Sequence, residues 1–249
     1  MRTDQIALQL WTVRDLLARD VPGTLRAVAA AGYRSVELAG LPELTTADLA
    51  AELRKAGLRP IAEHVGIDRL RADPSLVVDR LDELGCPRAI VPWLPEEERR
   101  TADDVRRFAS ELNSLAVLLA DRAITLGYHN HQFEFAPLDS TTVWEIFLAE
   151  LAPQSVLELD VYWASVGGRD PVDVINNAHG RIRLLHMKDR APGSEAHDAP
   201  AGAGMLDMRA IVRAAQGAGV EWYVAEQDEP RELLENIATA YRNLAALPD

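Results

Sequence analysis

A single cysteine, Cys86, is the only thiol among the 249 residues, so the chain cannot form an internal disulfide. This scarcity is typical of proteins from a reducing compartment, and we expect a cytoplasmic location. Long apolar runs are also missing, because no stretch reaches the roughly 18 residues that a membrane-spanning helix needs. The first residues lack the basic start and apolar middle of a signal peptide. The sequence therefore predicts no membrane partner.

Positive charge is scarce as well. The chain has 26 Lys and Arg residues against 39 Asp and Glu residues, which gives a formal net charge of −13. A nucleic-acid-binding surface normally needs clustered basic residues to neutralise phosphates, and the sequence has no dense cluster of this kind. We therefore expect no nucleic-acid partner. The 48% hydrophobic and 26% charged content is ordinary for a globular protein and excludes disorder of the whole chain.

One pattern recurs along the chain: a helical stretch ends at a glycine, and a short apolar run follows it. Gly32, Gly57 and Gly85 mark three such junctions, 25 and 28 residues apart. Glycine is favoured just past a helix because it adopts the left-handed conformation without a Cβ clash. The spacing corresponds to one helix, one strand and two loops, so the pattern predicts a regular alternation of helices and strands.

The predicted strands are short and almost entirely apolar, as is typical of strands covered on both faces. Eight such runs alternate with eight helical segments, which predicts a parallel eight-stranded α/β fold, a single (β/α)8 TIM barrel spanning residues 1–249. An open doubly wound sheet is the alternative, but no Gly-x-Gly-x-x-Gly follows the first strand. The predicted strands are Ile6–Trp11, Ser35–Leu38, Pro60–His64, Ala89–Trp93, Ile124–His129, Val156–Asp160, Ile182–His186 and Trp222–Glu226.

Polar, titratable residues gather at the carboxyl ends of these strands, where the active site of such a barrel lies. Any one of them alone can be explained as a helix cap or an ion-pair partner. Together they would repel one another unless a cation joined them. Oxygen and imidazole ligands suit a hard divalent ion, so we expect Mn²⁺, with Mg²⁺, Co²⁺ or Zn²⁺ as alternatives. The residues are Glu37, Glu63, His64, His129, Asn130, His131, Glu158, Asp160, His186, Lys188, Asp189, Glu226 and Asp228.

Six segments spread over nearly the whole chain carry a specific combination of motifs. They are "LQLWTVRD" (Leu8–Asp15), "GYRSVELAG" (Gly32–Gly40), "YHNHQFEF" (Tyr128–Phe135), "LELDVYWASVGGRDP" (Leu157–Pro171), "LLHMKD" (Leu184–Asp189) and "WYVAEQDEP" (Trp222–Pro230). In this combination the chain resembles the sugar phosphate isomerase/epimerase family of xylose isomerase-like TIM barrels. The resemblance implies one divalent metal ion and a small sugar or cyclitol substrate.

The resemblance also implies metal ligands. By position, three of them are Asp160, His186 and Glu226, from the sixth, seventh and eighth strands. The fifth strand departs from the family, because many members carry a glutamate where this chain has Tyr128, His129 and Asn130. We expect Glu134 to supply the fourth ligand by reaching back toward the strand, with His129 or His131 as the alternative.

The implied activity is that of an isomerase or epimerase, which moves a proton on a small sugar or keto-sugar through an enediolate. The candidate catalytic residues are Glu226, His129, His131 and Lys188. His64 and Glu37, at strand ends, are candidates for substrate binding, and His64 is also a candidate base. The flat rings of Trp11 and Trp163 can stack on the C–H faces of a sugar, although packing at the barrel mouth explains them equally well.

Two other activities compete with isomerisation. Histidine-rich fifth strands resemble the inosose dehydratase and keto-glycoside-processing branches, so a lyase that eliminates from an inosose or a 3-keto-glycoside is the close alternative. A phosphodiester-cleaving role occurs in distant barrels of the superfamily, but the net charge of −13 opposes binding to a polyanion. A barrel of this kind can also form a homo-oligomer, and the sequence does not locate an interface.

Overall fold

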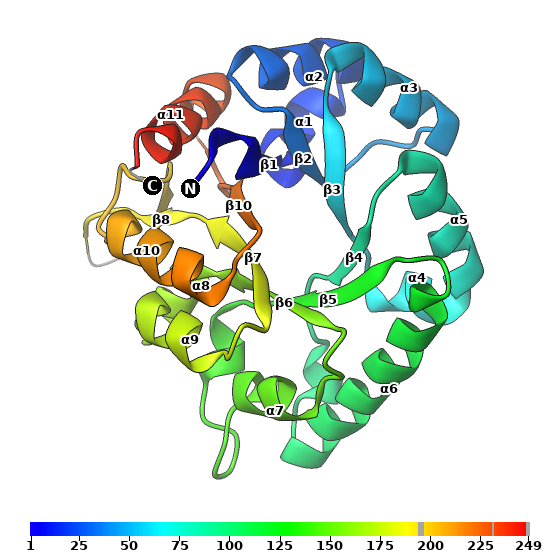
Figure 1. Cartoon of the computed structure of the whole chain (residues 1–249), viewed down its shortest axis with the longest axis vertical. Helices are drawn as coiled ribbons and strands as arrows, with labels where there is room; N and C mark the ends of the chain where they lie inside the picture. The colour runs from blue at the N-terminus through cyan, green and yellow to red at the C-terminus, as the bar shows by residue number, and fades with distance from the viewer. Residues whose placement is uncertain (194–196, 231, 248–249) are drawn as a thin grey trace.

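Eight parallel strands close into a barrel with helices around it (Figure 1). The structure is a computed structural model, and it describes residues 1–193, 197–230 and 232–247. The last strand of the barrel pairs with the first, so the sheet has no open edge. The predicted (β/α)8 barrel is confirmed, and this closure excludes the open doubly wound sheet. The strands are β1 (Ile6–Gln9), β2 (Ser35–Leu38), β3 (Arg59–His64), β4 (Arg88–Val91), β5 (Thr125–His129), β6 (Val156–Asp160), β7 (Ile182–Met187) and β10 (Trp222–Ala225).

Local capping groups mark the ends of several helices. Thr101 caps α6 in a capping box, while Asp73 and Asp207 cap α5 and α10 with their carboxylates. Gly57 and Gly85 end α3 and α5 in the left-handed conformation. The helices are α1 (Arg14–Leu17), α2 (Val21–Ala30), α3 (Thr46–Ala56), α4 (Ile67–Ala72), α5 (Pro74–Leu84), α6 (Ala102–Ala120), α7 (Val143–Glu150), α8 (Val161–Val166), α9 (Pro171–Asn177), α10 (Met208–Ala218) and α11 (Leu233–Ala245).

The first strand is shorter than the sequence predicts. It ends at Gln9, because the Gln9 side chain accepts a hydrogen bond from the backbone N–H of Trp11 and the chain turns into the 3-10 helix η2 (Leu10–Val13). The turn leaves the Trp11 ring 40% exposed instead of packed along a strand. Trp11 therefore stands at the rim of the barrel, which matters for the site described below.

The segment after β7 forms further structure before α10 begins. Two short strands, β8 (Asp189–Arg190) and β9 (Asp198–Ala199), pair antiparallel there. The buried Asp189 carboxylate accepts hydrogen bonds from the backbone N–H groups of Gly202, Gly204 and Leu206. Residues 194–196 of this segment lie outside the described residues. The carboxylate thus ties the end of β7 to the chain that leads into α10.

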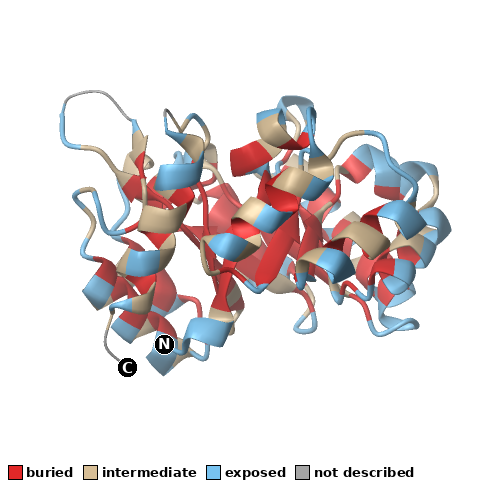
Figure 2. Ribbon diagram, turned by 90° about the horizontal axis from the view of Figure 1, so that it is seen from above, coloured by how far each residue is buried: buried red, intermediate tan, exposed pale blue. Residues whose placement is uncertain are grey.

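The strands are largely buried, and the helices around them carry both buried and exposed residues (Figure 2). A small interior cluster fills the barrel, and a larger one packs the helices against its outside. Among the described residues, no helix has the length and apolar content needed to span a bilayer. The interior cluster consists of Ala7, Ile61, Ala62, Ile90, Leu184 and Val224.

Candidate active site

Strand register brings the polar residues of the barrel together. On β5 and β6, His129 lies beside Glu158, and on β6 and β7, Asp160 lies beside His186. Glu158 and Asp160 are two residues apart on one strand, so their side chains share the inner face at two different heights. The site therefore has a lower layer centred on Glu158 and an upper layer centred on Asp160.

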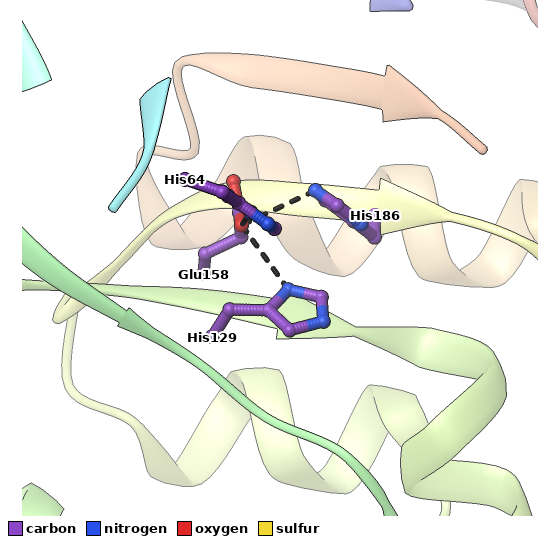
Figure 3. A group of neighbouring side chains, drawn as sticks. All are labelled: His64, His129, Glu158 and His186. Carbon is purple, nitrogen blue, oxygen red and sulfur yellow. Dashed lines mark hydrogen bonds and ion pairs between the residues drawn. The ribbon is translucent and has the colours of Figure 1, made fainter. Parts of the chain in front are cut away.

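The lower layer is a buried carboxylate surrounded by imidazole rings (Figure 3). Oε2 of Glu158 lies 2.9 Å from Nε2 of His64, 3.1 Å from Nδ1 of His129 and 3.2 Å from Nε2 of His186. A second carboxylate, Glu37, lies 2.6 Å from the same Nε2 of His186. Because β3, β5, β6 and β7 each contribute one residue to the Glu158 group, the layer joins strands from both sides of the barrel.

The upper layer surrounds a lysine. Nζ of Lys188 lies 3.2 Å from Oδ2 of Asp160, 2.9 Å from Oε2 of Glu226 and 2.8 Å from Oδ2 of Asp228. Nδ1 of His186 lies 2.8 Å from Oε2 of Glu226, so His186 belongs to both layers. A single ammonium group faces three carboxylates, and the layer retains net negative character next to the barrel mouth.

The carboxylates control the charge of the two buried bases among them. Burial lowers the pKa of His186, but the carboxylates of Glu158, Glu226 and Glu37 outweigh burial and raise it well above its usual range. Burial likewise opposes the charged form of Lys188, and its neighbouring carboxylates, Asp160 first, raise the pKa well above its usual range. Both side chains are therefore cations when no other positive charge is bound between these carboxylates.

Burial outweighs the neighbouring charges at the other groups of the site. It lowers the pKa of His129 well below its usual range, and it lowers the pKa of His131 to about 4, helped by the charge of Lys188. It raises the pKa of Asp160 to about 6 and, together with the charge of Glu158, raises the pKa of Glu37 to about 7. His129 and His131 are thus neutral near pH 7 and able to act as ligands or bases.

A cavity of about 560 Å³ opens above the upper layer. A volume of this size suits a small ligand, and its wall combines aromatic rings with a few polar groups. Trp11 and Trp93 stand on its rim, 40% and 50% exposed. The polar groups that line it are His64, His129, His131, Lys188, Glu226 and Asp228.

The upper layer has the donor set of a divalent metal site. Ligand atoms of Asp160, His186 and Glu226 all lie within 4.8 Å of one another. Oδ1 of Asp160 accepts a hydrogen bond from the backbone N–H of Trp163, whereas the buried Oδ2 has no hydrogen-bond partner among the described residues. A carboxylate oxygen that accepts no hydrogen bond is available as a ligand for a hard cation. The residues present therefore fit a metal ion, and His64, His129, Glu158 and His186 form a second group with the same ligand spacing.

Most of the site residues predicted from the sequence come together. Those at the cavity or beneath its floor are Asp160, His186, Glu226, Lys188, His129, His131, His64 and Trp11. Trp163 does not line this cavity. It lies beside the site, with its ring centroid 5.7 Å from that of His131 and 5.5 Å from Nζ of Lys188.

Two predicted carboxylates do not line the cavity. Glu134 is in neither metal-capable group, because one of its oxygens accepts from the Tyr128 hydroxyl and the other accepts from the backbone N–H of His131 at 2.8 Å. Glu37 does not line the cavity. It is fully buried in the lower layer, where Gln9 donates a hydrogen bond to it at 2.8 Å.

Sequence reasoning assigned no role to three residues that the structure places at the site. Glu158 and Asp228 lie two residues from Asp160 and Glu226, so strand alternation is the sequence signal that places them on the same face. Trp93 follows β4 at the same end of the barrel, and its position at the end of an apolar run was the available signal.

A closed parallel barrel with a metal-capable, carboxylate-rich mouth defines the class of protein. The chain belongs to the xylose isomerase-like TIM barrel family, whose family model matches residues 25–247. Its relatives include sugar phosphate isomerase/epimerases and a dehydratase.

Two solved structures are similar in fold over nearly the whole chain, and a third protein is similar in sequence over part of it. A sugar phosphate isomerase/epimerase from Parabacteroides distasonis ATCC 8503 is 25% identical with a TM-score of 0.87, over 100% of this chain and 96% of that one. The IolI protein, whose structure contains a bound zinc atom, is 16% identical with a TM-score of 0.78, over 98% of this chain and 97% of that one. An inosose dehydratase of Geobacillus kaustophilus (strain HTA426) is 28% identical over 204 residues, which are 68% of this chain and 65% of that protein. The match thus spans just under two thirds of the dehydratase.

Proposed function

We propose that the protein is a divalent-metal-dependent isomerase or epimerase of a small sugar or keto-sugar, acting by proton transfer through an enediolate. The observation that carries the proposal is the cluster of Asp160, His186 and Glu226 beside Lys188, at the floor of a cavity of about 560 Å³. The similarity to a sugar phosphate isomerase/epimerase over the whole chain supports the same substrate class.

Asp160, His186 and Glu226 would hold the ion, and we propose Mn²⁺ because two carboxylates and one imidazole suit it. When bound, the ion would polarise a substrate carbonyl and lower the pKa of the neighbouring C–H. Oδ2 of Asp160 is buried and accepts no hydrogen bond from the described residues, although Nζ of Lys188 lies 3.2 Å from it, so this oxygen is available to the ion. The bound zinc in the IolI protein supports a metal site in this fold.

The protein's own groups would move the proton. We assign this role to Glu226, His129 and His131, which line the cavity. One of them removes the C–H proton to give the enediolate. Returning the proton to the adjacent carbon isomerises the sugar, and returning it to the opposite face epimerises it. Groups placed in this way typically contribute a factor of about 10² to 10⁴ to the rate.

Lys188 would stabilise the oxyanion of the enediolate. Its ammonium is fully buried and fixed by three carboxylates, so it needs no reorganisation when negative charge develops on the substrate. Trp11 and Trp93 would cover the C–H faces of the ring, and His64, which also lines the cavity, would contact substrate hydroxyls. These contacts orient the sugar and exclude water from the reacting carbon.

A lyase acting at the same site is the second candidate. The imidazoles of His129 and His131 lie side by side, with ring centroids 5.1 Å apart, so a base and an acid are available at one strand end. Loss of a hydroxyl from the carbon next to the carbanion would dehydrate the substrate instead of isomerising it. The similarity to an inosose dehydratase supports this alternative.

One experiment separates the two. The protein is incubated with Mn²⁺ and a panel of ketoses, inososes and 3-keto-glycosides in D₂O, and the products are followed by NMR. Deuterium in a recovered or rearranged sugar supports the isomerase or epimerase, and an unsaturated product supports the lyase. The absence of C–H exchange from every substrate in the panel, with the metal bound, would contradict both.

A further inference from the structure

A second cavity, of about 430 Å³, opens beside the proposed active site, and two arginines line it. We propose that this cavity is a subsite for an anionic group of the substrate, a phosphate or a carboxylate, and that Arg69 is the residue that binds this group. The inference rests on the proposed function, because it assigns one end of the sugar substrate to the second cavity. It makes the protein selective for sugars that carry a negative charge away from the reacting carbons.

The two cavities share part of their walls. Ala39, Gly40 and His64 line both of them, so a ligand that contacts His64 in the first cavity can extend into the second. Gly40 has a φ of 61°, and a Cβ atom there would lie 2.7 Å from Cε3 of Trp11. The loop after β2 therefore packs against the Trp11 ring with no side chain between them, and it brings the rim of the first cavity to the edge of the second.

Charged residues of both signs line the second cavity, and what distinguishes them is which are already paired. The wall comes from the loop after β2, from β3 and from helices α3, α4 and α5. Its charged residues are Glu43, Glu63, Arg69 and Arg80. Glu43 is exposed, so water and salt screen its charge. The other three residues therefore decide which ligand the cavity can hold.

Arg80 is committed to the buried carboxylate of Glu63. Nε of Arg80 lies 2.9 Å from one oxygen of Glu63 and 3.0 Å from the other, and Nη1 donates to the Thr46 hydroxyl at 3.4 Å. Glu63 is only 4% exposed, and a carboxylate buried to this extent needs a cation beside it. The charges of Arg80 and Glu63 thus balance each other, and the pair forms a fixed part of the cavity wall.

Arg69 is the cation that this pairing leaves available. Its nearest carboxylate oxygen is Oε1 of Glu63, 3.5 Å from Nη1, and its guanidinium donates no hydrogen bond of good geometry to the described residues. An arginine side chain carries five N–H donors in a planar fork that matches the oxygens of a phosphate or a carboxylate. Glu63 therefore holds Arg69 beside the cavity by charge and leaves its donors free for a ligand.

A substrate anion needs such a cation because most of the chain repels it. The formal net charge is −13, and the wall of the first cavity carries the carboxylates of Glu226 and Asp228. Lys188 is the one lysine or arginine among the described residues that line the first cavity, and three carboxylates surround it. The sugar would therefore lie with its reacting carbons near Glu226 and its anionic end at Arg69.

The test compares sugars that differ in one charged group, with the full chain loaded with Mn²⁺. Isothermal titration calorimetry measures the affinity for D-glucose, D-glucose 6-phosphate, D-glucuronate and inorganic phosphate. Arg69→Met removes the cation and keeps an apolar stem, and Arg69→Lys keeps the charge without the planar fork. Arg122→Met is the matched control, because the Arg122 side chain is also 54% exposed and paired with a carboxylate, that of Asp82. Arg122 lies before β5, at the amino ends of the strands.

We expect the wild type to bind at least one of the two anionic sugars more tightly than D-glucose, and the two arms show whether the subsite takes a phosphate or a carboxylate. Arg69→Met should weaken binding of that sugar about 10- to 100-fold, the usual effect of losing a charge-assisted hydrogen bond, and leave the affinity for D-glucose unchanged. Arg69→Lys should keep part of the preference, and Arg122→Met all of it. Three results would overturn the proposal: equal affinity of the wild type for neutral and anionic sugars, an unchanged preference in Arg69→Met, or no binding of any probe at millimolar concentrations.

Asp160→Asn separates this inference from the proposed function. A preference that is lost in Asp160→Asn but kept in Arg69→Met would mean that the anion binds at the metal, which would remove the subsite and leave the proposed metal site intact. A preference that is lost in Arg69→Met but kept in Asp160→Asn would support the subsite even if the D₂O panel contradicted the proposed reaction. Circular dichroism checks that each variant is folded, and Arg69→Lys tests the same position with a smaller change if Arg69→Met does not fold.

Discussion

Lys188 and Asp160 form a buried ion pair at the mouth of the barrel, with Nζ of Lys188 3.2 Å from Oδ2 of Asp160. That oxygen has the ammonium at ion-pair distance but no hydrogen bond of good geometry among the described residues. The lysine balances part of the charge of the upper layer and leaves Asp160 a free lone pair. Lys188 can therefore serve the reaction without being a metal ligand.

Replacing Lys188 with Met separates charge stabilisation from metal binding. Lys188→Met removes a cation that competes for the same carboxylates, so the variant should bind Mn²⁺ at least as tightly as the wild type. Its kcat should fall by a factor of about 10² to 10³, the usual effect of losing one group that stabilises an oxyanion. Metal content by elemental analysis and turnover on the substrate found in the D₂O panel check this result, and an unchanged kcat would remove the proposed role of Lys188.

Trp93 was not predicted as a site residue, and its role can be tested. It is 50% exposed on the rim of the cavity, so a bound sugar can cover it. Trp93→Ala should raise KM with little change in kcat or metal content, because the ring would contribute to binding and not to proton transfer. Leu76→Ala is the control, since Leu76 is 66% exposed on α5 and does not line the cavity. Equal KM values for Trp93→Ala and the wild type would mean that the sugar does not reach this ring.

Glu134 affects the pH dependence of stability. Burial raises its pKa from 4.5 to about 8 in the folded chain. Between these values the folded state holds a proton that the unfolded state has lost, so this group lowers the free energy of unfolding as pH rises, by up to about 1.4 kcal/mol per pH unit. Its stabilising contribution is complete below the unfolded pKa and is lost as pH rises through the folded one.

Glu134→Gln removes this titration, so its Tm should decline less than that of the wild type between about pH 5 and about pH 8. The variant should also keep its metal, because Glu134 stands outside the proposed ligand set. Calorimetry across this pH range measures the first effect, with Glu145→Gln, at an exposed carboxylate on α7, as the control, and elemental analysis measures the second. Loss of metal from Glu134→Gln would restore Glu134 as the ligand from strand five.

Gly127 permits close packing of strand β5 against its neighbours. A Cβ atom at this position would lie 2.5 Å from Cδ1 of Ile90 and 2.9 Å from Cγ2 of Val156. Gly127→Ala should therefore lower the free energy of unfolding by about 1 to 3 kcal/mol, measured by urea denaturation. Gly217→Ala is the matched control, because Gly217 lies in α10 and an added Cβ there would meet no neighbouring atom of the described residues within 4 Å. It should stabilise the helix by up to about 1 kcal/mol, and equal effects of the two substitutions would contradict the packing explanation.

The fold and much of the site could be predicted because strand alternation and barrel closure fix them. Once β6, β7 and β10 are placed in a parallel barrel, Asp160, His186 and Glu226 must meet at the carboxyl end. The apolar spacing in α6 and the glycines after α3 and α5 similarly depend only on local rules. Such features need no knowledge of how distant side chains pack.

Two features that strand alternation does not fix depend on short turns just past a strand. Beyond β1, the Gln9 side chain turns the backbone and leaves Trp11 at the rim. Beyond β5, the 3-10 helix η4 (Gln132–Phe135) places the Glu134 carboxylate at the backbone N–H of His131, and Glu134 does not line the cavity. The spacing of residues 131 and 134 is that of a capping box, which was the local signal against a ligand role.

Anomalous diffraction from a crystal of the Mn²⁺-loaded protein tests the central claim most directly, because it locates the ion without reference to activity. The account predicts one strong peak within bonding distance of Oδ2 of Asp160, Nδ1 of His186 and a carboxylate oxygen of Glu226. A fully loaded crystal with its peak in the lower layer between His64 and Glu158, or on the outer surface of the barrel, would contradict it.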